Sequence, residues 1–282
     1  MKRQQVPSRL LLIVFAILLG VAGCETASCH RCSCVYDACG PMVSSSYGET
    51  IVDEPVVKSW SPATNGLVMA WESENGSDKI ISAGGGPDWR FKPRGKAKFA
   101  DNGVMQLERG AIVVVGGDET LLEACKISNE LSIEIIFTAA RKQQFGPARI
   151  VTFSSNANSR NFTLGHEGDH LILRLRTPRT GNNGSPPETK LAAVTEGTPQ
   201  HVVVTYGDGL LNCFVNGKRV VEDLKLRGDF SNWGKHHLLL GDEYDGKRDW
   251  AGSVQRLGLY SRALDAVEIQ ERYESALAVL NR

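Results

Sequence analysis

The sequence has no excess of charge of either sign. Its 32 lysine and arginine residues balance 32 aspartate and glutamate residues, so the formal net charge is zero. A nucleic-acid-binding protein usually carries a basic excess or a basic stripe. The nearest approach to one is the short mixed stretch Arg90–Lys98, which we interpret as a solvated surface loop. The composition therefore does not indicate a nucleic-acid partner.

An apolar run of membrane-spanning length is also missing. The run near the N-terminus, Leu10–Leu19, is shorter than the roughly 20 residues that a transmembrane helix needs. Basic residues precede it (Lys2, Arg3 and Arg9) and small residues follow it. This order is typical of an export signal. Residues 1–23 are therefore predicted to be a signal peptide.

The residues after this run, Val21–Cys24, resemble a bacterial lipobox. The resemblance implies that Cys24 carries the lipid anchor and becomes the first residue of the mature chain. Two or more acyl chains hold a protein at a bilayer far better than one. Glu25 follows where an aspartate would resemble an inner-membrane retention signal, so the outer membrane is favoured if the cell has one. The alternative is an ordinary secretory signal with an incidental cysteine.

Residues 24–62 are predicted to be a tether between the anchor and a folded domain. Pro41–Pro62 is mostly small, polar and acidic, which is typical of a linker. Four cysteines lie close to the anchor: Cys29, Cys32, Cys34 and Cys39. One interpretation is a small disulfide loop, which suits an exported protein. The second is free thiols. The third is a metal site, which the C-x-x-C spacing allows. Four cysteines allow three pairings, and spacing does not choose among them.

Residues 63–282 break into short apolar runs between turn residues. Leu131–Phe137 and Leu171–Leu175 alternate with a period of two, which indicates strands with one buried face. Further runs are predicted to be strands at Val68–Trp71, Ala111–Val115, Arg149–Phe153, Asn161–Leu164, Leu238–Gly241 and Gly252–Tyr260. Many short strands with regular turns predict an all-β antiparallel sandwich of the jelly-roll kind.

Three of these runs follow one another as a predicted meander: His201–Tyr206, Leu210–Val215 and Lys218–Val221. The turn between the second and third is Asn216-Gly217, a strong hairpin signal because both residues accept positive φ.

One short C-terminal helix is predicted after Asp265. Asp265 can cap it, with Glu268 as the partner of a capping box. An apolar stripe for packing follows at Ile269, Tyr273, Ala276, Leu277 and Leu280.

Several segments resemble the laminin-G-like, concanavalin A-like jelly rolls. The most specific is "HVVVTYGDGLLNCFVNGK" (His201–Lys218), and four more occur in the family's order: "LSIEIIF" from Leu131, "NFTLGHEGDHLILRLRT" from Asn161, "LLLGDE" from Leu238 and "WAGSVQRLGLYSRALDAVEI" from Trp250. The resemblance covers Leu121–Glu271 and implies that the first strand pairs with the last. It implies a fold, and fold alone does not give function.

Catalytic patterns are absent from this domain. Jelly-roll hydrolases carry paired carboxylates on one strand as E-x-D-x-x-E, whereas Glu134 stands alone among apolar residues. No G-x-S-x-G is present, and Cys125 and Cys213 are expected to be small buried hydrophobes, with a disulfide between them as the alternative in an exported protein. The sequence therefore predicts a protein that is not an enzyme.

Binding residues are expected in the loops near the C-terminal third. The resemblance implies a rim site where calcium is a candidate ligand, through oxygens of Asp229, Asn232, Asp242, Glu243 and Asp245. The alternative is that these side chains are simply solvated. Trp233 and Tyr244 could stack on a sugar, whereas Trp250 is expected in the core.

Together these observations predict a lipid-anchored protein of the cell envelope. Its laminin-G-like module would bind a glycan or a protein partner. The alternatives are a structural subunit of an envelope assembly and, less favoured, a divergent glycan hydrolase.

Overall fold

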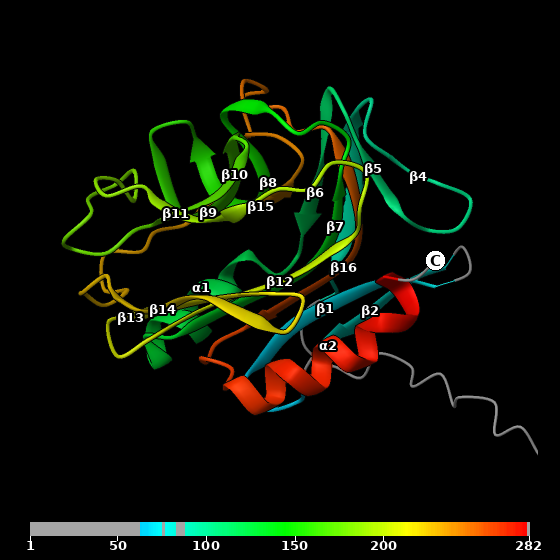
Figure 1. The fold of residues 1–282 in the computed structure, drawn as a ribbon. Coiled ribbons are helices and arrows are strands. Elements are labelled where there is room, and N and C mark those ends of the chain that lie inside the picture. Colours follow the sequence, from blue (N-terminus) through cyan, green and yellow to red (C-terminus); the bar gives the residue numbers. More distant parts are fainter. Residues whose placement is uncertain (1–62, 75–76, 83–87, 281–282) are drawn as a thin grey trace, which may run out of the picture. The chain divides into compact units, whose positions relative to one another are not determined.

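The computed structural model describes residues 63–74, 77–82 and 88–280, all within one compact unit. In this part of the chain two antiparallel sheets face each other as a sandwich, which confirms the expected fold class (Figure 1). The predicted signal peptide (1–23) and tether (24–62) lie outside the described residues, with Cys24, Cys29, Cys32, Cys34 and Cys39. They stay predictions.

The first sheet has nine strands within the described residues. They are β1 (Leu67–Glu74), β2 (Ser77–Ser82), β4 (Lys98–Phe99), β5 (Met105–Leu107), β7 (Leu131–Ala139), β12 (Gln200–Gly207), β13 (Leu210–Val215), β14 (Lys218–Lys225) and β16 (Gly252–Tyr260). Their order is β14-β13-β12-β7-β16-β1-β2, and β5 pairs with both β16 and β4. The pairing of β1 with β16 confirms that the first strand lies beside the last.

The second sheet has seven strands in the same described region. They are β3 (Arg90–Gly95), β6 (Gly110–Val115), β8 (Gln144–Asn156), β9 (Ser159–Gly168), β10 (His170–Leu175), β11 (Thr189–Ala193) and β15 (His237–Leu240). Their order is β11-β10-β9-β8-β15-β6-β3. Every predicted strand is present, and five short ones were not predicted: β2, β3, β4, β5 and β11.

The core lies between the two inner faces. Ile133, Ile135 and Phe137 of β7 are fully buried there, as their alternation predicts. Each such side chain contributes about 1.5–3 kcal/mol by leaving water. Trp250 is also fully buried and meets Phe137 edge-on, with ring centroids 5.8 Å apart. The expected core position of Trp250 is therefore confirmed.

The predicted meander is β12-β13-β14. Asn216 and Gly217 adopt φ of 49° and 74° at the second turn, and Asp208 and Gly209 adopt 51° and 74° at the first. Two consecutive residues with positive φ give the turn whose twist suits a hairpin. Turn chemistry in the sequence therefore set the register of these strands.

Two helices accompany the sheets. The helix α1 (Asp118–Ser128) was not predicted, and it places Leu121, Leu122 and Cys125 in the core. The helix α2 (Ala266–Leu280) was predicted and lies against the outside of the first sheet (Figure 1). Among the described residues, neither helix is long and apolar enough to cross a membrane.

The capping box of α2 is formed as predicted. The Asp265 side chain accepts hydrogen bonds from the backbone N–H groups of Val267 and Glu268, both at 2.9 Å. In return, the Glu268 carboxylate accepts one from the Asp265 N–H at 3.1 Å. These bonds satisfy backbone donors that a helix start leaves unpaired.

Glu134 holds α2 against the sheet. It is buried on the outer face of β7, where it accepts hydrogen bonds from His201 Nε2 and Tyr260 Oη at 3.0 Å each. Arg272 of α2 adds an ion pair, with Nε 2.6 Å from Glu134 Oε2. Burial alone would raise the pKa of Glu134, but the bond from His201 and the charge of Arg272 outweigh it and hold this pKa at about 2. The isolated carboxylate of the sequence is therefore a structural anchor.

Candidate functional site

The segment Gly241–Trp250, here called the rim loop, connects β15 to β16 across one end of the sandwich. Its two ends are closed by a hydrogen bond of 2.7 Å from the Trp250 N–H to the Gly241 carbonyl. Gly241 has a φ of 94°, and a Cβ there would lie 2.9 Å from the Gly110 carbonyl oxygen. Only glycine suits this backbone without strain. The loop therefore leaves the strand at a fixed angle.

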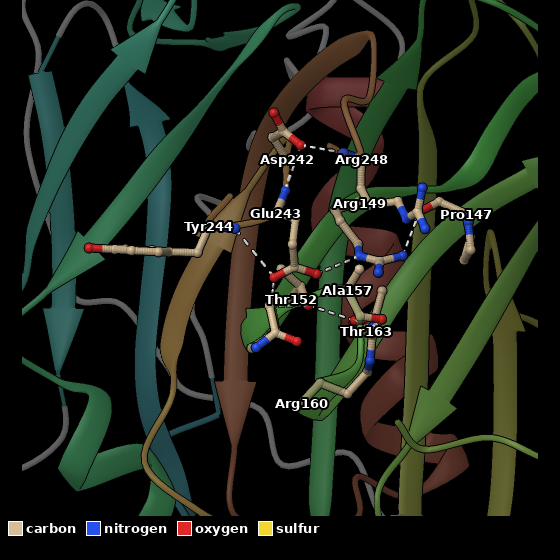
Figure 2. A network of polar contacts seen from close by, with 12 residues as sticks. Pro147, Arg149, Thr152, Ala157, Arg160, Thr163, Asp242, Glu243, Tyr244 and Arg248 are labelled. Atoms are coloured by element: carbon tan, nitrogen blue, oxygen red, sulfur yellow. Dashed lines mark hydrogen bonds and ion pairs between the residues drawn. The ribbon is translucent and has the colours of Figure 1, made fainter. Parts of the chain in front are cut away.

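Glu243 ties the rim loop to the second sheet from below. Its carboxylate accepts a hydrogen bond from Arg149 Nε at 3.0 Å, and both side chains are fully buried. Ser154 also donates to Glu243. The Tyr244 N–H donates to the same carboxylate at 3.3 Å (Figure 2). A buried ion pair costs about 3–5 kcal/mol to break, because the remaining charge has no partner. Glu243 therefore fixes the loop.

Further buried polar groups surround this pair. Arg160 is fully buried and donates to Thr163 Oγ1 at 2.9 Å and to the Ala157 carbonyl, and Thr163 lies 2.6 Å from Thr152 Oγ1 (Figure 2). Burial, together with the charge of Arg149, lowers the pKa of Arg160 to about 9. The network joins the second sheet to the rim loop, although the buried Arg149 Nη2 and Arg160 Nε have no hydrogen-bond partner among the described residues.

Asp242 shapes the loop from within. Its Oδ1 accepts hydrogen bonds from the Glu243 and Arg248 N–H groups, both at 2.7 Å. Side-chain oxygens of aspartate commonly organise turns in this way. Asp242 and Glu243 are adjacent in sequence, yet both are committed to holding the loop.

Above this polar network lies a pocket of about 480 Å³, here called the rim pocket. Its chemistry is carried by Arg94, Arg109, Asp242, Tyr244, Asp245 and Asp249. Its volume falls in the range of about 300–1,000 Å³ that is usual for ligand sites. The pocket is thus built from β3, from the β5–β6 turn and from the rim loop.

Tyr244 is the exposed aromatic group of the rim pocket. It keeps 45% of its surface exposed, although His237 stacks on it with ring centroids 4.3 Å apart. Arg94 holds the backbone at this point, because its guanidinium donates to the Tyr244 and Glu243 carbonyls at 2.8 and 2.9 Å. The guanidinium also lies 5.4 Å from the tyrosine ring centroid. The ring is therefore presented on a braced support.

The carboxylates of the rim pocket influence one another. Burial raises the pKa of Asp249, and the charge of Asp242 adds to this rise against a 3.1 Å hydrogen bond from the Gly110 N–H. Asp245 faces Lys247 at 3.4 Å in an exposed pair. Carboxylate oxygens beside an exposed ring can accept hydrogen bonds from hydroxyl groups while the ring packs on C–H groups.

The structure separates the residues that the sequence grouped as one candidate site. Asp242, Tyr244 and Asp245 line the rim pocket, whereas Glu243 lies beneath it. Asp229, Asn232 and Trp233 precede β15, so they lie at the other end of that strand. The candidate residues therefore do not form one site.

Trp233 was wrongly expected to stack on a ligand. Only 4% of it is exposed, its Nε1 donates to the Arg176 carbonyl at 2.8 Å, and Phe230 stacks on it at 4.1 Å. The sequence placed it in a polar loop, and tertiary packing turns it inward. The large apolar surface of a tryptophan side chain favours its burial against a neighbouring aromatic ring, here that of Phe230.

The residues present do not fit the calcium site that the resemblance implied. Both oxygens of Glu243 already accept hydrogen bonds from the protein, and Asp229 Oδ1 accepts one from the Ser231 N–H at 3.0 Å. In the described ranges no three His, Cys, Asp or Glu side chains converge to hold a metal ion.

Two sets of residues were missed from the sequence. Arg90–Lys98 was interpreted as a loop, but Arg90–Gly95 is β3, and Arg94 contacts the rim loop. The alternation of Arg90, Lys92 and Arg94 with Phe91 was an available signal for a strand. Arg149 gave no signal, because its partner lies 94 residues away in sequence.

The two cysteines of the domain are free and buried, as expected. Burial raises the pKa of the Cys213 thiol to about 12 and that of Cys125 further above its ordinary value. Neither is a candidate nucleophile.

Solved structures with this fold share little sequence with the chain. The binding domain of botulinum neurotoxin serotype C1 is 11% identical, with a TM-score of 0.54 over 74% of this chain and 52% of that structure. Domain 4 of AbnA, an extracellular arabinanase from Geobacillus stearothermophilus solved with arabinotriose, is 14% identical, with a TM-score of 0.52 over 75% of this chain and 100% of that one. The chain spans about half the length of the neurotoxin binding domains that it matches. At such identities these likenesses establish the fold alone.

A third similar structure is of botulinum neurotoxin type C, whose cell entry depends on interaction with two ganglioside molecules. It is 12% identical, with a TM-score of 0.53 over 73% of this chain and 50% of that structure. No curated protein sequence matches the chain. Residues 117–270, more than half of the chain, match the family model of the concanavalin A-like lectin/glucanases superfamily. The chain therefore belongs to that superfamily.

Proposed function

We propose that this protein binds a carbohydrate in the rim pocket without transforming it. The observation that carries the proposal is the half-exposed Tyr244 ring in a pocket that also presents carboxylates and arginines. Pyranose rings have C–H faces that pack on aromatic rings and hydroxyl groups that bond to carboxylates. The buried ion pair of Arg149 and Glu243 beneath the loop supports this, because a preorganised site loses less entropy on binding.

The relatives supply a second line of support. One structural neighbour is a domain solved with arabinotriose, and another is a neurotoxin whose entry depends on two ganglioside molecules. Both ligands carry saccharides, and each belongs to the neighbour. They make a saccharide the first ligand class to test.

Binding is favoured over hydrolysis because the buried carboxylates are already engaged. Glu134 is paired with Arg272 on one sheet, and Glu243 with Arg149 on the other. In the rim pocket Asp242 accepts hydrogen bonds from two backbone N–H groups, Asp249 accepts one from the Gly110 N–H, and Asp245 faces Lys247. A glycosidase needs two carboxyl groups facing one sugar at about 5–9.5 Å. Release of reducing ends from a bound glycan would contradict this assignment.

The test is a glycan array with the full chain, followed by calorimetry on the strongest ligand. Tyr244→Ala should weaken binding at least about tenfold, since an aromatic contact at the centre of a site commonly carries this much of the affinity. The matched control is Ile127→Ala, because Ile127 is an apolar side chain on α1 with 81% exposure. Equal affinity of the two variants would refute the site.

The proposal also includes localisation of the protein at the cell envelope. Cys24 would tether the protein to a membrane, with residues 24–62 as a spacer that lets the module reach its ligand. Cys24→Ser should move the protein from the membrane fraction to the soluble fraction. An unchanged membrane fraction would contradict the lipid anchor, but it would not bear on the proposed binding in the rim pocket.

A further inference from the structure

A second pocket, of about 760 Å³, lies where the β4–β5 hairpin meets the ends of β7 and β16. Four polar residues form a row across it: Lys98 pairs with Gln106, Gln106 with Ser253, and Ser253 with Thr138. Residues directly opposite one another in antiparallel strands place their side chains on the same face. The row therefore presents one ammonium group, one amide and two hydroxyl groups to a single surface. Gln255 Nε2 donates to the Thr138 and Ser253 hydroxyl oxygens at 3.1 and 3.4 Å, which leaves the two O–H groups as donors for a ligand.

This pocket is basic, and we call it the basic pocket. Lys96 also lines it, and both Lys96 and Lys98 are exposed. The carboxylate on its wall, Glu108, is paired with Arg141 at 2.8 Å. Among the described residues, no carboxylate pairs with either lysine. Two unpaired ammonium groups beside neutral donors favour an anionic group.

The basic pocket adjoins the rim pocket. Three segments contribute neighbouring residues to both: 94–96, 108–110 and 249–252. These segments are joined by hydrogen bonds of 3.1 Å from the Lys96 N–H to the Arg109 carbonyl and from the Gly110 N–H to Asp249 Oδ1. The two pockets therefore border on the same three segments, which hydrogen bonds hold together.

We propose that the basic pocket binds the carboxylate or sulfate group of an acidic saccharide whose neighbouring sugar occupies the rim pocket. Lys96 and Lys98 hold the anionic group, while Gln106, Ser253 and Thr138 bond to hydroxyl groups of the same sugar. The rim pocket supplies the aromatic contact but carries three carboxylates of its own, so it does not select an anion. This inference rests on the proposed function and names its ligand class.

The test compares matched saccharides on the full chain. An array carries trimers of galactose, glucose and N-acetylglucosamine, each in a neutral, a 6-carboxylate and a 6-sulfate form, and inorganic sulfate is titrated separately. The wild-type protein should bind at least one acidic form about fivefold or more tighter than its neutral counterpart in 50 mM salt. The preference should shrink in 500 mM salt, because salt screens exposed charges.

The variant Lys96→Gln/Lys98→Gln should bind neutral trimers as the wild-type protein does and lose the preference for acidic ones. Its matched control is Lys218→Gln/Lys225→Gln, which removes the same charge from β14 at the far edge of the sheet. The 6-carboxylate and 6-sulfate arms tell which anionic group is bound. Both variants should have the melting temperature of the wild-type protein, since all four lysines are exposed.

Three results would overturn the inference: no acidic preference in the wild-type protein, an equal loss in the control variant, or binding of inorganic sulfate without any acidic saccharide. Failure of the proposed function is distinct. It would appear as binding of neutral trimers that Tyr244→Ala leaves unchanged, or as binding of no saccharide in any form.

Discussion

The Arg149–Glu243 pair offers the most exacting test of how the rim pocket is built. Glu243→Gln keeps the size of the side chain but removes its charge. Arg149 would stay fully buried with a guanidinium that has lost its counter-charge. Burial already lowers the pKa of Arg149 in the presence of Glu243, so losing this partner makes its charge more costly still. The variant should be destabilised by about 3 kcal/mol.

For a domain of this size, such a loss lowers the melting temperature by about 10 °C. Urea denaturation followed by tryptophan fluorescence measures the free energy of unfolding directly. The matched control is Glu222→Gln, which breaks the exposed pair of Arg219 and Glu222 on β14. An exposed pair is worth about 0–1 kcal/mol, so the control should stay close to the wild-type protein.

A double-mutant cycle separates the cost of leaving the Arg149 charge unpaired from the loss of the favourable interaction between Arg149 and Glu243. Arg149→Met combined with Glu243→Gln removes the unpaired charge, so the double variant should be more stable than Glu243→Gln alone. Amide hydrogen exchange at Tyr244–Arg248 should also quicken in the single variant, because the loop has lost its anchor. If Glu243→Gln costs no more than Glu222→Gln, the pair does not hold the loop and this account of the site fails.

Three further predictions concern the rest of the domain. The pKa of Glu134, about 2, lies below its ordinary value of 4.5, so its stabilisation is complete above about pH 4.5 and is lost as the pH falls towards 2. Denaturation curves should show a loss of about 3 kcal/mol over that window, and a Glu134→Gln variant with the same slope would contradict the assignment. Asp265→Ala should cost about 1 kcal/mol by urea denaturation, whereas Asp265→Asn should cost little because asparagine also caps helices; equal losses would contradict the capping box. Peptide-resolved thiol labelling should leave Cys125 and Cys213 unmodified until the domain unfolds, and labelling of native protein at the rate of an exposed thiol would disagree with their burial.

Local signals in the sequence were sufficient for much of the fold. The alternation in Leu131–Phe137 places its odd-numbered residues inside for a simple geometric reason, since successive side chains point to opposite faces. Asn216-Gly217 and the pair Asp265 and Glu268 act within a few residues of themselves, so they can be recognised without a structure. The short strands β4 and β5 lack such a signal, because two or three residues cannot show a period.

The candidate site was only partly predictable. Its loop was identified because aspartate and glycine gather in it, but the roles of adjacent residues were not. Glu243 is buried and structural while its neighbour Tyr244 is half exposed, because successive residues in the loop face opposite environments. Trp233 has the same sequence features as Tyr244 for stacking on a sugar, and only its packing on Phe230 distinguishes the two.

The sequence by itself determined the longer strands, the hairpin turns, the capped helix and the neutral overall charge, since each depends on nearby residues or on composition. Tertiary structure alone decided which carboxylate faces solvent, which aromatic ring is covered, and that Lys98, Gln106, Ser253 and Thr138 stand in one row. Those facts depend on pairings between residues up to 147 positions apart (Gln106 and Ser253), and local periodicity carries no information about such pairings. The binding surface is therefore a property of the assembled sandwich, and the strands β3, β4 and β5 that contribute to it were themselves not predicted from the sequence.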